Sequence, residues 1–188
     1  MKDEKVWNVP NILTVIRIAL VGVLVYFFAA GKLFWALGVF VIAGVTDYLD
    51  GYIARKYNLI TSFGKMMDPF ADKLMVVTTL ICFTVIGKVP LWAPLLTAAK
   101  EITMTAGGIL LLKRGIVPYA HWIGKSATIL FVVAIIAVFF QEWITPWDLM
   151  LLTAAVLLSI AAFFWYLRQV LQTINHREDT PGDHHNQP

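Results

Sequence analysis

Four aspartates lie close together in one apolar region of this chain, and their spacing points to specific chemistry. Asp47 and Asp50 are three residues apart, and Asp68 and Asp72 are four residues apart. Residues at these spacings share one face of a helix, so each pair presents two carboxylates side by side. Carboxylates inside a bilayer are costly and usually functional. Two such pairs facing each other could bind two divalent cations through oxygen ligands.

Small residues and one cation are interleaved with the aspartates. Gly51, Ala54 and Arg55 follow the first pair, and Gly64 precedes the second. Small side chains allow a ligand to approach the backbone closely, and an arginine can bind a phosphate through a bidentate fork. Packing between membrane helices also uses small residues, but it does not require four aspartates and an arginine at fixed spacing. The pattern therefore favours a site for a phosphate-containing ligand.

The composition indicates a membrane protein. Of the 188 residues, 59% are hydrophobic and 14% are charged, and a single cysteine excludes an intrachain disulfide. Six apolar segments approach the roughly 20 residues that cross a bilayer: 11–30, 33–55, 66–86, 91–112, 122–140 and 147–167. Short connections with Gly, Pro or charged residues predict antiparallel neighbours. We therefore expect an all-α integral membrane protein with six transmembrane helices over residues 1–174, and a disordered polar tail over 175–188.

The basic residues predict how this protein lies in the cell membrane. One side carries most of them: Lys2, Lys5, Arg55, Lys56, Lys65, Lys113, Arg114, Lys125 and Arg168. The other side carries only Lys32 and Lys88, so the positive-inside rule places the first side and both termini in the cytoplasm. Asp47 precedes Arg55 by eight residues, which puts it about 12 Å deeper along a helix. The aspartates then lie in the cytoplasmic third of the bilayer, at the depth of a lipid headgroup.

A cation pathway is the alternative from a different functional class. Facing carboxylates within the membrane could line the pathway of a transporter or channel. That interpretation predicts polar residues continuing across the bilayer, whereas residues 33–42 and 76–86 are almost wholly apolar. A polar site on one side of the membrane suits an enzyme better.

The aspartate region resembles the CDP-alcohol phosphotransferase family. The family pattern is D-x2-D-G-x2-A-R-x8-G-x3-D-x3-D, and this chain meets every specified position. Residues 8–17 and 68–74 are also similar to segments of bacterial phosphatidylglycerophosphate synthases and of the related CMP-forming cardiolipin synthases. The layout of six spans matches as well, so the resemblance covers most of residues 8–170.

The resemblance implies a transfer reaction with CDP-diacylglycerol as the donor. The hydroxyl of an acceptor alcohol would attack the β-phosphorus, and CMP would leave. Asp47, Asp50 and Asp68 would ligate two Mg²⁺ or Mn²⁺ ions, and Asp72 would lie close to the second ion and act as the general base. Four buried carboxylates without cations would repel one another, so ion binding also explains how the cluster is tolerated. The family further implies a homodimer, and no nucleic-acid partner is expected.

The same resemblance implies a nucleotide site beside the aspartates. Four residues of the pattern would line the cytidine diphosphate: Gly51, Ala54, Arg55 and Gly64. Asn11 and Thr14 are candidates for hydrogen bonds to the nucleotide. Helix capping at the start of the first span is an equally weighted alternative for these two residues.

The acceptor is open between two alternatives. Phosphatidylglycerophosphate synthases use sn-glycerol 3-phosphate, whose phosphate needs cations, and the candidates here are Lys100, Arg114 and Lys125. Many of these enzymes have arginine at the position of Lys100 and lysine at that of Ala127, and lysine does not replace a bidentate arginine. Pairing of Lys100 with a nearby carboxylate and snorkelling of Lys125 are the alternatives for the lysines. We expect sn-glycerol 3-phosphate as the acceptor, with phosphatidylglycerol, and hence cardiolipin synthesis, as the second possibility.

Overall fold

The computed structural model describes residues 9–56, 62–113 and 122–178. All regular elements in these ranges are helices: α1 (Val9–Ala29), α2 (Leu33–Lys56), α3 (Ser62–Val85), α4 (Trp92–Lys113), α5 (Trp122–Phe139), α6 (Gln141–Ile144) and α7 (Trp147–Glu178). The six long helices begin within a few residues of the six predicted segments. The short helix α6 lies where a loop was expected, and α7 continues past residue 175, the predicted start of the tail. Residues 179–188 lie outside the described ranges.

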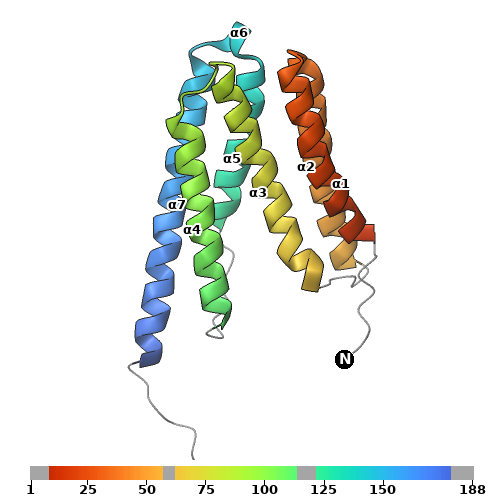
Figure 1. The fold of residues 1–188 in the computed structure, drawn as a ribbon. Helices are drawn as coiled ribbons and strands as arrows, with labels where there is room; N and C mark the ends of the chain where they lie inside the picture. The colour runs from red at the N-terminus through yellow and green to blue at the C-terminus, as the bar shows by residue number, and fades with distance from the viewer. Residues whose placement is uncertain (1–8, 57–61, 114–121, 179–188) are drawn as a thin grey trace, which may run out of the picture.

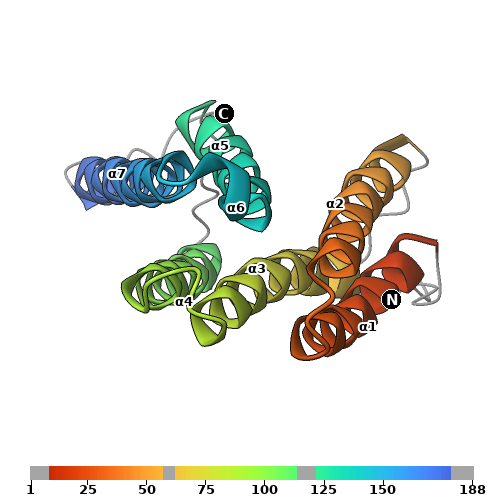
Figure 2. The same ribbon diagram turned by 90° about the horizontal axis from the view of Figure 1, so that it is seen from above.

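The six long helices run alternately up and down in the view of Figure 1. α1, α3 and α5 begin at the lower end, and α2, α4 and α7 end there. Figure 2 shows α1 and α2 on one side, α5 and α7 on the other, and α3 and α4 between them. α1 packs against both α2 and α3, α4 packs against α3 and α7, and α5 packs mainly against α7. The start of α1 and the end of α7 therefore share one end of the bundle.

Two glycines close the helices at the upper end. Gly31 has a φ of 69° and Gly87 a φ of 76°, a left-handed conformation that glycine adopts without steric cost. The Gly31 N–H donates to the Phe28 carbonyl at 3.0 Å, and the Lys32 N–H donates to the Phe27 carbonyl at 2.9 Å. The same pair of bonds follows α3 at Gly87. These are Schellman motifs, which satisfy the last helix carbonyls and confirm the two turns predicted here.

A cluster of phenylalanines joins four helices near the same upper end. The Phe83 ring lies 5.1 Å from that of Phe28 and 4.7 Å from that of Phe139, measured between centroids. Phe40 lies 6.3 Å from Phe139. The four rings come from α1, α3, α5 and α2, and all four side chains are buried. The apolar core is thus concentrated away from the polar residues of the lower half.

Three helices in the described ranges are long and apolar enough to cross a membrane. The candidate spans are Asn11–Ala29, Leu33–Ile53 and Trp147–Gln169, and Ser126–Phe139 is a shorter apolar helix. α3 contains three charged residues between positions 68 and 73, which lower its hydropathy. The chain is therefore an all-helical protein with membrane-spanning character, and the count of six spans stays a prediction.

Candidate functional site

The buried face of α1 changes from polar to apolar along its length. Its buried residues recur at intervals of three and four: Asn11, Thr14, Arg17, Val21, Leu24 and Phe28. This spacing keeps them on one face of the helix, toward α2 and α3. The three residues nearest the lower end are polar, and the three nearest the upper end are apolar. α1 thus contributes a polar surface to the interior at the lower end.

Arg17 joins this polar face to the first aspartate pair. Its Nη1 lies 2.7 Å from Asp47 Oδ1, and its Nη2 donates a hydrogen bond to Asp50 Oδ2. The side chains of Arg17 and Asp50 are 1% and 3% exposed, whereas that of Asp47 is 42% exposed. The two carboxylates therefore lie side by side, as the spacing predicted, and one of them faces an accessible region.

Asp72 lies on α3 next to the same group. It is half-buried, and its electrostatic neighbours include Asp47 and Arg17. Arg17 is eight residues from the start of α1, and Asp72 is ten residues from the start of α3, so both lie at a similar level of the bundle. The structure thus places Asp72 of α3 within electrostatic range of Asp47 and Arg17, and α2 and α3 both pack on α1.

The predicted two-metal site is only partly within the described residues. The Asp68 side chain is outside them, although its backbone lies in α3. Among the residues that are described, no group of three or more His, Cys, Asp or Glu side chains is close enough to bind a metal ion. The donor set of Asp47 and Asp50 nevertheless fits a hard divalent cation, because carboxylate oxygens are its preferred ligands. Metal ligation by these aspartates stays a prediction.

The predicted nucleotide residues are described in part. Asn11 and Thr14 are 5% and 0% exposed and lie inside α1, past the position of an N-cap residue. Their burial beside Arg17 therefore has a cause other than N-capping. Gly51 is half-buried and follows Asp50 directly on α2. The side chain of Arg55 and the surroundings of Ala54 and Gly64 lie outside the described residues.

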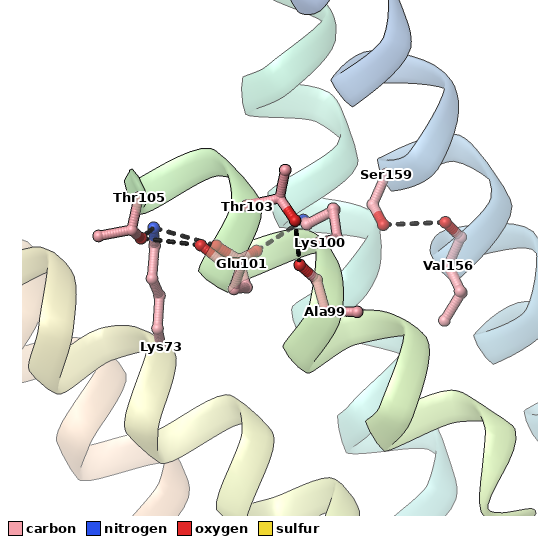
Figure 3. A network of polar contacts seen from close by, with 8 residues as sticks. All are labelled: Lys73, Ala99, Lys100, Glu101, Thr103, Thr105, Val156 and Ser159. Carbon is pink, nitrogen blue, oxygen red and sulfur yellow. Dashed lines mark hydrogen bonds and ion pairs between the residues drawn. The ribbon is translucent and has the colours of Figure 1, made fainter. Parts of the chain in front are cut away.

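One of the predicted acceptor cations is already paired. Lys100 Nζ lies 2.6 Å from Glu101 Oε1, which is the carboxylate pairing considered as its alternative role. Glu101 Oε2 also lies 3.2 Å from Lys73 Nζ, and Lys73 donates a hydrogen bond of 2.7 Å to Thr105 Oγ1. Figure 3 shows this network, in which Lys73 reaches from α3 to Glu101 and Thr105 on α4. Arg114 and the Lys125 side chain lie outside the described residues.

Lys73 and Arg17 are the two cations to which the sequence alone assigned no role. Lys73 follows Asp72 directly, and this adjacency was the signal that could have indicated it. Arg17 is separated from Asp50 by 33 residues, and no local pattern predicts that pairing. Arg17 lies beside the two carboxylates of α2, and Lys73 of α3 lies beside Glu101 of α4.

Comparisons with known proteins agree with this arrangement. The family model for CDP-alcohol phosphatidyltransferase matches residues 7–165. A protein named "Probable phosphatidylglycerophosphate synthase" from Mycobacterium tuberculosis is 32% identical over 181 residues, covering 90% of this chain and 85% of that protein. The "CDP-diacylglycerol--glycerol-3-phosphate 3-phosphatidyltransferase" of Bacillus subtilis is 33% identical over 174 residues, covering 84% and 89%. A "Cardiolipin synthase (CMP-forming)" from Streptomyces coelicolor is 34% identical over 135 residues, covering 68% and 63%. The chain therefore belongs to the CDP-alcohol phosphatidyltransferase family.

Proposed function

We propose that this protein transfers the phosphatidyl group of CDP-diacylglycerol to sn-glycerol 3-phosphate, giving phosphatidylglycerophosphate and CMP. The observation that carries the proposal is the pairing of Asp47 and Asp50 on α2 through Arg17, with Asp72 of α3 an electrostatic neighbour of Asp47, in the region that the family model matches. The two relatives matched over most of their length are named for this activity. The family match also favours a transferase over a cation pathway.

The proposed reaction is a displacement at the β-phosphorus of the donor. The hydroxyl oxygen of the acceptor forms a bond to this phosphorus, and the bond between phosphorus and the CMP oxygen breaks. Asp72 takes the proton of the attacking hydroxyl, because it is the half-buried carboxylate beside the pair on α2. The electrons of the broken bond stay on the phosphate oxygen of the departing CMP.

The role proposed for Asp47, Asp50 and Asp68 is to hold two divalent cations, Mg²⁺ or Mn²⁺. Such ions would supply positive charge for the diphosphate and for the departing CMP phosphate. The exposure of Asp47 supports this role, since it leaves a carboxylate accessible from outside the bundle. Around these residues, Gly51, Ala54, Arg55, Gly64, Asn11 and Thr14 are proposed to line the cytidine diphosphate.

The cations near α3 and α4 support a charged acceptor. Lys73 of α3 and Lys100 of α4 both lie against Glu101. A phosphate monoester carries two negative charges near neutral pH, and two lysines could share it with Glu101 nearby. Lys125 and Arg114 are proposed to add to this set. The relative named as a cardiolipin synthase keeps phosphatidylglycerol as the second candidate acceptor.

The proposed setting is the cell membrane, with six spans, both termini in the cytoplasm and the site open to the cytoplasm. The start of α1 and the end of α7 lie at the same end of the bundle, which supports placing both termini on one side of the membrane. The excess of basic residues on that side supports its cytoplasmic location. A homodimer and a disordered tail beyond α7 belong to the same proposal.

An acceptor panel tests this function. Purified full-length protein in detergent micelles would be incubated with CDP-diacylglycerol, Mg²⁺ or Mn²⁺, and one acceptor at a time. We expect CMP release and a phosphatidylglycerophosphate product with sn-glycerol 3-phosphate. A lipid product with phosphatidylglycerol and none with sn-glycerol 3-phosphate would instead establish cardiolipin synthesis. No CMP with any alcohol would contradict the proposed class of reaction.

A further inference from the structure

Arg17 has the largest fully buried side chain among the described residues, and its charge is permanent. It is 1% exposed, yet both of its terminal nitrogens lie against carboxylate oxygens of α2. A guanidinium stays protonated in proteins, so it cannot avoid the cost of burial by losing its proton. A buried charge of this kind is tolerated only where partners of opposite charge surround it. Asp47 and Asp50 are those partners.

The contacts of Arg17 use atoms that the proposed metal ions also need. Arg17 lies against Oδ1 of Asp47 and Oδ2 of Asp50, one oxygen of each carboxylate. Each carboxylate has a second oxygen, but a positive guanidinium at this distance repels a divalent cation that approaches either one. The guanidinium of Arg17 and a metal ion would therefore compete for the same two carboxylates.

We propose that Arg17 is the internal counter-cation of the metal-free site. It keeps Asp47 and Asp50 side by side and neutralises part of their charge until divalent ions bind, and it competes with those ions for the carboxylates. This proposal rests on the proposed metal-binding role of the two aspartates. Arg17 is a positioning residue in this account, because it acts through the carboxylates and not on the substrate.

A counter-cation role has a thermodynamic consequence that a purely structural role of Arg17 would not have. Without the charge of Arg17, the metal-free protein contains two adjacent carboxylates that have lost the cation they share, whereas bound ions supply positive charge in the metal-loaded protein. Loss of the charge therefore destabilises the metal-free state more than the loaded state. By linkage, the folded protein then binds the metal more tightly.

Binding of Mn²⁺ to the full-length protein, without substrate, tests this inference. The dissociation constant would be measured from the electron paramagnetic resonance signal of free Mn²⁺ for the wild type and for Arg17→Gln. A charge-assisted contact corresponds to a factor of about ten to a hundred, so the dissociation constant should fall by that factor in the variant. The thermal unfolding midpoint of Arg17→Gln should fall strongly in EDTA and much less in saturating Mn²⁺.

Two control variants separate the role of this charge from a general effect. Arg168→Gln removes the same charge from an exposed position on α7 and should leave Mn²⁺ affinity unchanged. Arg17→Lys keeps the charge but not the two-pronged contact, and its Mn²⁺ affinity should stay closer to the wild type than that of Arg17→Gln. Unchanged or weaker Mn²⁺ binding in Arg17→Gln would overturn the inference. A variant that is folded only in Mn²⁺ would support it, and one that is unfolded in both conditions would contradict it, because the metal should replace the missing charge.

The same measurements distinguish failure of this inference from failure of the proposed function. Asp47→Asn should weaken Mn²⁺ binding if the aspartates are metal ligands. Equal Mn²⁺ binding by Asp47→Asn and the wild type would reject the metal site itself. Weaker binding by Asp47→Asn together with unchanged binding by Arg17→Gln would leave the metal site in place and reject only the role of Arg17.

Discussion

The described carboxylates of the site have different surroundings, although they belong to one motif. Asp50 is almost completely buried against Arg17, Asp47 is partly exposed, and Asp72 is half-buried on a separate helix. A buried carboxylate needs a fixed partner, whereas an exposed one can exchange its partner for a ligand. At this scale, Asp47 and Asp72 present the more accessible carboxylates, and Asp50 is the carboxylate buried with Arg17.

Removal of one charged oxygen ligand should abolish nearly all activity. Asp47→Asn, Asp50→Asn and Asp68→Asn each keep the size of the side chain and remove its charge, so each should lose nearly all CMP release. EDTA should do the same to the wild type, and added Mg²⁺ or Mn²⁺ should restore the rate. A near-normal rate in any one of these variants, or in EDTA, would contradict the two-metal proposal.

Asp72→Asn should separate binding from turnover. If Asp72 acts as the general base, the variant should have no measurable turnover but should still bind CDP-diacylglycerol, because an amide cannot accept the proton of the acceptor. Donor binding would be measured by equilibrium binding of labelled CDP-diacylglycerol in Mn²⁺. A loss of donor binding as large as that of Asp47→Asn would show that Asp72 is chiefly a metal ligand.

At the scale of elements, α1 supplies the cation that lies against the two aspartates of α2, and α4 supplies the glutamate that pairs with Lys73 of α3. The sequence predicted the six long helices and the turns at Gly31 and Gly87, because apolar length and glycine chemistry are local signals. It did not predict that Arg17 would lie between Asp47 and Asp50, because the pairing depends on how α1 packs on α2. Short helix α6 was also missed, since a single turn has too few residues for a periodic pattern.

The two candidate acceptor lysines, Lys100 on α4 and Lys125 on α5, should affect the acceptor and not the donor. Lys125→Ala should raise the KM for sn-glycerol 3-phosphate about ten- to a hundredfold, the worth of one charge-assisted phosphate contact. Lys100→Ala should raise it less, because Lys100 is already paired with Glu101 at 2.6 Å. The KM for CDP-diacylglycerol should change little in both variants.

Lys32→Ala is the matched control for the acceptor prediction. Lys32 is an exposed lysine in the turn between α1 and α2, at the opposite end of the bundle from the site. The Lys32→Ala substitution should leave the KM values for sn-glycerol 3-phosphate and for CDP-diacylglycerol at the wild-type level. Equal KM values for sn-glycerol 3-phosphate in Lys125→Ala and Lys32→Ala would remove Lys125 from the acceptor site.

The first turn of α7 contains a buried charge that the proposed chemistry does not use. Asp148 is fully buried, and neither carboxylate oxygen has a hydrogen-bond partner among the described residues. The helix N-terminus favours a negative charge there by about 0.3–1 kcal/mol, less than the several kcal/mol that burial of an ion costs. Asp148→Asn should therefore raise the thermal unfolding midpoint by about 2–4 °C. CMP release should be unchanged, and a lower midpoint would show that the charge has a stabilising partner.

At the scale of the whole molecule, polar chemistry and apolar packing are separated along the bundle. The cluster of Phe28, Phe40, Phe83 and Phe139 lies near the upper ends of α1, α3 and α5, and the carboxylates lie in the lower half. The sequence predicted that the aspartates would share one side of the membrane, but it could not predict which aromatic side chains would meet. The apolar end thus packs four helices together, and the predicted site lies toward the other end.

Phe139→Leu should test this separation. Phe139 contacts three other rings, and an aromatic pair is worth about 0.5–1.5 kcal/mol beyond the area it buries. The variant should lower the thermal unfolding midpoint equally in EDTA and in Mn²⁺, because no metal ligand lies near the ring. A selective loss of Mn²⁺ affinity would show that the two ends of the bundle are coupled.

The ion pairs of Arg17 also constrain how the chain enters the membrane during synthesis. A lone arginine in the middle of an apolar helix costs about 2.5–3.5 kcal/mol on the scale of translocon insertion, and its partners on α2 are synthesised later. The connection at Gly31 is short and closed by its own hydrogen bonds, so α2 can fold back on α1 at once. The first two helices are therefore expected to insert together, as one hairpin in which Arg17 is already paired with its two carboxylates.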